Sequence, residues 1–219
     1  KCKDKIHQTF YAFIKVTFEI LMRFFMTLFF IILSTNIKAE IISRSVGELF
    51  VVFVSGEISK GDMQKLTSLP IERGKTIVLL NSDGGSTFDA ITISAFLVTK
   101  DVITYVLPGH QCLSECALIW LSGFRKMLSN SSSVGFGNSS YELNKKEKKI
   151  IGPMFLGESF NPEISGLGFV LVGAFLQKGL GLDFEFIKFL KSSNTGPRYL
   201  SQLDFDKYNI EVLFEDDES

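Results

Sequence analysis

Two short segments carry residues of the types that acyl-transfer chemistry needs. Gly84 and Gly85 follow an apolar run, and Ser114 stands directly before a second one, Glu115–Leu121. A serine at the N-terminus of a helix lies beside free N–H groups and the positive end of the helix dipole, which can stabilise an oxyanion. A Gly-Gly pair lets a second N–H donor approach without an obstructing side chain. We therefore predict Ser114 as a nucleophile. The predicted oxyanion hole consists of the N–H groups of Gly84, Gly85 and Glu115.

The elements that would position these residues alternate between strand and helix. Short β-branched or aromatic runs predict buried strands, and apolar residues at helical spacing predict helices between them. This alternation favours parallel strands joined by right-handed crossovers. Active sites in such sheets lie beyond the carboxyl ends of the strands, where we expect the loops 81–86 and 109–114. The predicted strands are 49–54, 76–80 and 102–107, and the predicted helices are 60–69, 87–99 and 115–121.

The second half of the chain carries further patterns. A Ser/Asn/Gly-rich loop, 129–140, surrounds a short predicted strand at 133–136. Two helices with apolar residues at helical spacing are predicted at 166–179 and 182–191. The basic run 145–149 is typical of a solvated face and is too short for a nucleic-acid footprint.

The motifs around both candidate segments resemble those of the ClpP-like serine peptidases, and most closely the exported members. Residues 79–86 (LLNSDGGS) resemble the family's I-N-S-P-G-G signature, with Asp83 in place of the proline. Residues 112–123 (CLSECALIWLSG) resemble its serine elbow, in which the nucleophile precedes a buried helix and a glycine follows nine residues later. The resemblance is best over 48–140. It implies an α/β fold of the ClpP/crotonase type, with repeated ββα/βαβ units, a mostly parallel sheet and no cofactor.

The resemblance also implies a catalytic triad, which the chain lacks in part. Family members place the histidine about two dozen residues after the serine, where this chain has Gly137. The chain has two histidines, His7 and His110. His110 precedes Ser114 by four residues, so we expect it to brace the loop more readily than to act as the base. The region 192–194 offers no carboxylate as the acid, which leaves Asp183 and Asp204 as distant candidates.

Three functions follow from this incomplete site. The first is a weakly active or silent ClpP-like domain that binds a peptide or protein segment by strand addition. The second is an active serine endopeptidase that uses a Ser–Lys dyad, with Lys126, Lys148 or Lys149, or His110 as its base. The third is crotonase-like acyl chemistry, which export would disfavour because coenzyme A is cytoplasmic. A homo-oligomer is compatible with the first two.

The first 39 residues predict a leader. Arg23 precedes a largely apolar run, 24–33, which is much shorter than the roughly 20 residues that span a bilayer. Residues 37–39 (IKA) before Glu40 are an acceptable cleavage site, so 22–39 is typical of a secretory signal. We expect the protein to be exported, periplasmic or secreted. The alternative is an uncleaved membrane anchor over 9–33.

Composition sets the remaining limits. Lys plus Arg (23) nearly balances Asp plus Glu (24), so the chain lacks the basic excess of a nucleic-acid-binding protein. Cys112 and Cys116 are four residues apart, which fits either a disulfide or two buried thiols. No further cysteine or histidine completes a metal site with them. We predict one domain over 40–215, followed by an acidic tail, 216–219.

Overall fold

The computed structural model describes residues 39–137, 141–157, 161, 167–191 and 197–216. Of the predicted leader, only Ala39 belongs to this part of the chain. Ala39 is buried, and its N–H donates to Glu57 O at 2.8 Å. The first strand begins at the next residue, Glu40.

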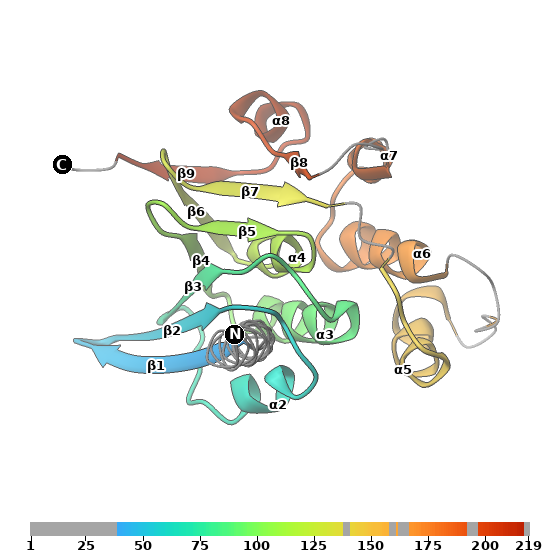
Figure 1. The fold of residues 1–219 in the computed structure, drawn as a ribbon, viewed down its shortest axis with the longest axis horizontal. Helices are drawn as coiled ribbons and strands as arrows, with labels where there is room; N and C mark the ends of the chain where they lie inside the picture. The colour runs from blue at the N-terminus through green and yellow to red at the C-terminus, as the bar shows by residue number, and fades with distance from the viewer. Residues whose placement is uncertain (1–38, 138–140, 158–160, 162–166, 192–196, 217–219) are drawn as a thin grey trace, which may run out of the picture. The chain divides into compact units, whose positions relative to one another are not determined.

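In the described ranges, the larger sheet has six strands and is mostly parallel. Its two first strands form an antiparallel hairpin, and the remaining neighbours pair in parallel. This mixed α/β architecture agrees with the predicted fold class (Figure 1). In spatial order the strands are β1 (Glu40–Val46), β2 (Leu49–Ser55), β3 (Thr76–Asn81), β4 (Ile103–Val106), β6 (Arg125–Ser129) and β9 (Val212–Glu215).

In the described residues, a second sheet of three short strands includes the strand that directly precedes the predicted nucleophile. It consists of β5 (Gln111–Leu113), β7 (Ser133–Phe136) and β8 (Arg198–Tyr199). β5 and β7 are parallel, with Leu113 opposite Gly135. A bridge between Ser82 and Cys112 joins this sheet to the end of β3. The carboxyl ends of β3, β5 and β7 are thereby held together.

Helices pack against strands of both sheets. Ser86 caps α3, since its Oγ accepts the N–H of Asp89 at 3.2 Å. α3 packs against α2 and α4. No helix in the described ranges has the length and the apolar character to cross a bilayer. The helices are α2 (Asp62–Thr67), α3 (Thr87–Val98), α4 (Glu115–Leu121), α5 (Lys145–Leu156), α6 (Leu167–Ala174) with the π-helical turn η1 (Phe175–Gly179), α7 (Phe184–Lys191) and α8 (Gln202–Lys207).

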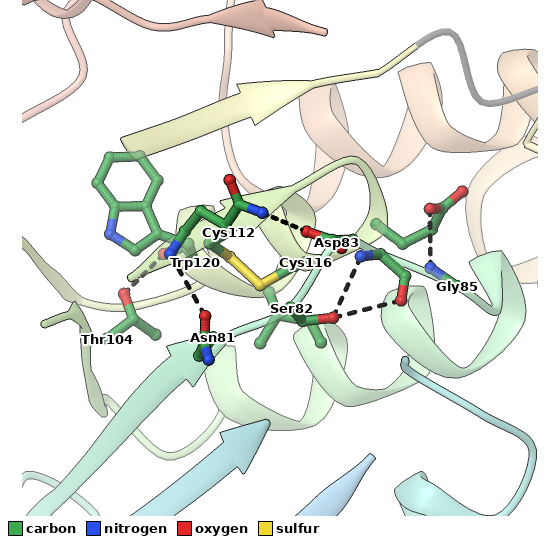
Figure 2. The surroundings of a disulfide bond; sticks show 12 residues. Asn81, Ser82, Asp83, Gly85, Thr104, Cys112, Cys116 and Trp120 are labelled. Atoms are coloured by element: carbon green, nitrogen blue, oxygen red, sulfur yellow. Dashed lines mark hydrogen bonds between the residues drawn. A yellow bond between two sulfur atoms is a disulfide. The ribbon is translucent and has the colours of Figure 1, made fainter. Parts of the chain in front are cut away.

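The centre of the core is α4, of which all seven residues are buried. Its carboxyl end is clamped to β4, because Thr104 Oγ1 donates to Trp120 O at 2.7 Å (Figure 2). Gly123, just beyond the helix, lies so close to Thr104 that a Cβ would overlap with the threonine hydroxyl. This contact is a physical reason for a glycine nine residues after Ser114.

Candidate functional site

Ser114 lies on a strained turn between β5 and α4. Its φ of 53° and ψ of −118° are sparsely populated by residues other than glycine, and such a conformation costs about 1–3 kcal/mol. The turn is held because the Ser114 N–H donates to Gly135 O on β7 at 2.8 Å. A sharp strand-to-helix turn of this kind presents the hydroxyl at the N-terminus of a buried helix. The geometry is therefore that of a nucleophile elbow.

A disulfide spans this elbow. Cys112 on β5 and Cys116 on α4 are bonded, with their Cα atoms 5.1 Å apart (Figure 2). Both cysteines are fully buried. The spacing fits either a disulfide or two buried thiols, and the structure contains the disulfide. Ser114 is the central residue of the loop that the bond closes, so the bond restricts the strained conformation from both sides.

Gly84 lies directly against the elbow. A Cβ built on Gly84 would be 2.8 Å from Ser114 Cβ and 3.2 Å from the backbone nitrogen of Glu115. No side chain fits there, and the φ of 113° also favours glycine. The structure thus brings together the residues that the sequence predicts as nucleophile and oxyanion loop. The Gly84 N–H itself donates to Ser82 Oγ at 3.1 Å (Figure 2).

Gly85 lies directly against the backbone of Ile58. It forms a bridge with Ile58, and a Cβ on Gly85 would overlap with the Ile58 carbonyl oxygen. The carbonyl of Gly84 accepts the Ile58 N–H at 2.8 Å, and the Ile58 carbonyl accepts the Ser86 N–H at 2.7 Å. Asp83, which stands where the family has proline, accepts the Gln111 Nε2 at 2.6 Å. The loop is therefore fixed on both sides.

The Glu115 side chain accepts a hydrogen bond from one of the predicted oxyanion donors. Its Oε2 accepts the Gly85 N–H at 3.1 Å (Figure 2). Its Oε1 accepts the Thr87 hydroxyl at 3.1 Å. Only 4% of Glu115 is exposed. Of the three predicted donors, the Gly84 and Gly85 amides thus bind side-chain oxygens. As the first residue of α4, Glu115 contributes an N–H that lacks an intrahelical acceptor.

The carboxylate of Glu115 and the hydroxyl of Thr87 were not predicted as part of the site. A signal was present in the sequence, because Glu115 is the single charged residue in an otherwise apolar helix. A charge in such a helix must find hydrogen-bond donors when it is buried. Which donors it finds depends on how α3 packs against α4, and that packing is a property of the fold.

His110 forms no hydrogen bond to Ser114 in the described part of the chain. The two residues flank β5, the three-residue strand Gln111–Leu113. His110 is half-buried; its ring Nδ1 lies 2.8 Å from Pro108 O, and the ring packs edge-on with Phe53. The ring braces the turn before β5, as its position in the sequence suggested.

Lys126 lies at the opposite end of α4 from Ser114. Its ammonium donates to Gly123 O at 2.9 Å, beyond the carboxyl end of the helix. Burial lowers the pKa of Lys126, and the nearby Glu211 carboxylate partly opposes that effect. Lys148 and Lys149 are in the first turns of α5, one half-buried and the other exposed. In the part of the chain that the structure describes, none of these lysines hydrogen-bonds to the Ser114 hydroxyl.

Gly137 stands where the sequence resemblance predicts the histidine. It follows β7, and the register that places Leu113 opposite Gly135 puts Gly137 beside the elbow at the carboxyl ends of both strands. Asp183 and Asp204, the distant candidates for the acid, both accept backbone N–H groups at helix starts, from Glu185 and Ser201 respectively. The region 192–194 lies outside the described residues.

No cluster of three metal-ligating side chains occurs among the residues described, and neither Ser114 nor Glu115 lies in such a group. A cleft lies at the far end of the elbow helix. It measures about 610 Å³ and is lined by residues that include Leu121, Lys126 and Tyr208. This cleft is separated from Ser114 by the length of α4.

Neither a protein-family model nor a curated protein sequence matches this chain. Solved structures do match. The 1510-N membrane-bound stomatin-specific protease matches in one mutant form at 16% identity and a TM-score of 0.48, over 74% of this chain and 77% of that one. A second mutant, in complex with a substrate peptide, matches at 16% identity and 0.49, over 78% and 77%. A ClpP1 mutant from Listeria monocytogenes matches at 15% identity and 0.47, over 75% and 91%.

The chain therefore resembles ClpP-like serine peptidases among solved structures as well as in its sequence motifs. What the site can do has to follow from the residues of this chain.

Proposed function

We propose that this protein is a ClpP-like domain that keeps the serine elbow but is silent or only weakly active as a peptidase, and that it binds a peptide or protein segment instead. The resemblance to peptidases supplies the ligand class. The loss of activity is supported by the residues around Ser114, above all by Glu115.

The observation that carries the proposal is the carboxylate of Glu115 on the Gly85 N–H. Acyl transfer places a negative charge on the substrate oxygen, and the donors of an oxyanion hole must be free to receive it. Here the Gly85 N–H, one of the predicted donors, already donates to the Glu115 carboxylate. Two negative charges 4 Å apart repel by about 4 kcal/mol at an effective dielectric constant of 20, which is about three orders of magnitude in rate.

The second support is the absence of a base. No titratable side chain among the described residues hydrogen-bonds to the Ser114 hydroxyl, and Gly137 stands at the position of the family's histidine. A serine without a base is a poor nucleophile. Removal of triad members from serine proteases leaves only the small contribution of the oxyanion hole and binding.

Labelling with a fluorophosphonate probe tests the proposal. We expect no labelling of the unmodified protein above that of Ser114→Ala. The double variant Glu115→Met, Gly137→His frees the Gly85 N–H and supplies an imidazole beside the elbow, so we expect it to gain labelling that Ser114→Ala abolishes. The matched control is Glu115→Met, Gly137→Ala, which stiffens residue 137 equally without adding a base.

A second candidate function is an active peptidase, and one observation favours it. The strained φ of Ser114 is of the kind that clusters at active sites. Labelling of the unmodified protein that disappears in Ser114→Ala would establish this activity and refute silence. Glu115→Gln would then separate two roles: labelling falls if the carboxylate acts as the base, and rises if it blocks the oxyanion.

A further inference from the structure

The edge strand β1 leaves one side of the larger sheet open. β1 pairs with β2 through all seven of its residues, and no other strand of the described chain pairs with its outer edge. Six of its seven residues are exposed. A long exposed edge offers a row of backbone donors and acceptors to another strand. Such an edge is a site for strand addition.

One face of this edge combines apolar and charged residues. Glu40, Ile42, Arg44 and Val46 alternate along β1 and therefore share a face. Ile42 is 50% exposed and Val46 is 56% exposed. In the described residues neither Glu40 nor Arg44 forms an ion pair, so both charges are available to a partner.

Two-fold symmetry limits how two copies of β1 can pair. In an antiparallel pair, two residues that lie opposite each other point to the same side of the sheet. The two-fold axis keeps each residue on the same side as its equivalent in the other copy. The allowed registers are therefore those that pair residues from the same face of β1. The register centred on Ile42 puts Glu40 of each copy opposite Arg44 of the other. It also puts the two Ile42 side chains in contact at the dyad.

The other registers are less favourable. A register centred on Ser43 places Ile42 opposite Arg44 and leaves Glu40 opposite Val46. A register centred on Arg44 places two positive charges directly opposite each other, which is destabilising. Opposite charges in cross-strand pairs stabilise a sheet, and the Ile42 register makes two such pairs at once.

We propose that two copies of this protein associate through antiparallel β1–β1 pairing centred on Ile42, with reciprocal Glu40–Arg44 ion pairs. The self-complementary charge pattern identifies a second copy as the occupant of this edge. β1 carries none of the residues of the serine elbow, so the association does not depend on whether Ser114 is active. The larger sheet would continue across the dyad from one copy into the other.

Charge reversal tests the register. Sedimentation velocity of the full chain should show a concentration-dependent monomer–dimer equilibrium. Arg44→Glu places four carboxylates at the dimer contact, and we expect it to raise the dimer dissociation constant at least tenfold. Glu40→Arg should weaken the dimer similarly. The double variant Glu40→Arg, Arg44→Glu restores both pairs with exchanged signs, so its dissociation constant should return close to that of the unmodified protein.

Cysteine cross-linking provides an independent measurement. In a Cys2→Ser background, Ile42→Cys places two thiols at the dyad and should form an intermolecular disulfide under mild oxidation. Val46→Cys is the matched control, because it is exposed to a similar degree but lies about 13 Å from the dyad on each copy. A monomer at all concentrations, equal cross-linking at positions 42 and 46, or a double charge variant as weak as the single ones would overturn the proposal.

Discussion

At the scale of residues, the serine elbow depends on close approaches that only glycine allows. Gly84 touches Ser114, and Gly85 touches the backbone of Ile58. These contacts bring the loop after β3 against the elbow at a separation that no side chain permits. The same close approach allows the Glu115 carboxylate to reach the Gly85 N–H. The Gly85 N–H could therefore bind an oxyanion, or the Glu115 carboxylate could keep the oxyanion away from it.

Replacement of Gly85 by alanine should destabilise the fold strongly. The φ of 140° strains any other residue, and the new Cβ would overlap with the Ile58 carbonyl. We expect a loss of about 3 kcal/mol or more in the free energy of unfolding, measured by urea denaturation. Gly109→Ala is the matched control, since its φ is 71° but nothing lies within 4 Å of the new Cβ. That variant should lose about 1–2 kcal/mol. Equal losses would show that the contact with Ile58 contributes nothing.

Sequence motifs located Ser114, Gly84 and Gly85, because turns and helix starts need particular residue types at fixed spacing. They did not reveal the role of the Glu115 side chain. The motif predicts only that the backbone N–H of residue 115 is a donor, and this prediction is the same for any side chain at that position. The direction of that side chain is set by Thr87 and Gly85, which come from a different crossover.

At the scale of elements, predictability followed the length and the apolar content of each segment. The buried helix Glu115–Leu121 and the strand Ser133–Phe136 have the bounds that the sequence predicted. β5 was not predicted, because its three residues lie between a turn and the elbow and are too few for a period to be read. β1 and β9 were missed because edge strands are exposed and carry charged residues.

The connection between β5 and α4 should depend on its disulfide. Closing so short a loop contributes about 2 kcal/mol to stability by restricting the unfolded chain. We expect a reductant to lower the unfolding free energy of the unmodified protein by about that amount. The matched control is Cys112→Ala, Cys116→Ala, whose stability the reductant should not change. If Cys112 and Cys116 are instead thiols in solution, they will react with a thiol reagent in denaturant without prior reduction.

At the scale of the whole molecule, the disulfide and the N-terminal sequence point to the same compartment. Disulfides persist in oxidising environments such as the periplasm and are rare in the cytosol. The sequence 22–39 has the pattern of a secretory signal, and β1 begins at Glu40, directly after the predicted cleavage site. We propose that the protein is exported and that cleavage leaves β1 at the start of the mature chain.

Expression in a bacterial host tests export. We expect the protein in the periplasmic fraction, with Glu40 as its first residue by N-terminal sequencing, because small residues are required at the end of a signal peptide and Ala39 supplies one. Ala39→Trp should block cleavage and leave the full leader on a membrane-associated chain. A version that starts at Glu40 without a leader should stay in the cytosol with Cys112 and Cys116 reduced. An intact leader on unmodified protein in the membrane fraction would contradict cleavage and favour the anchor over 9–33.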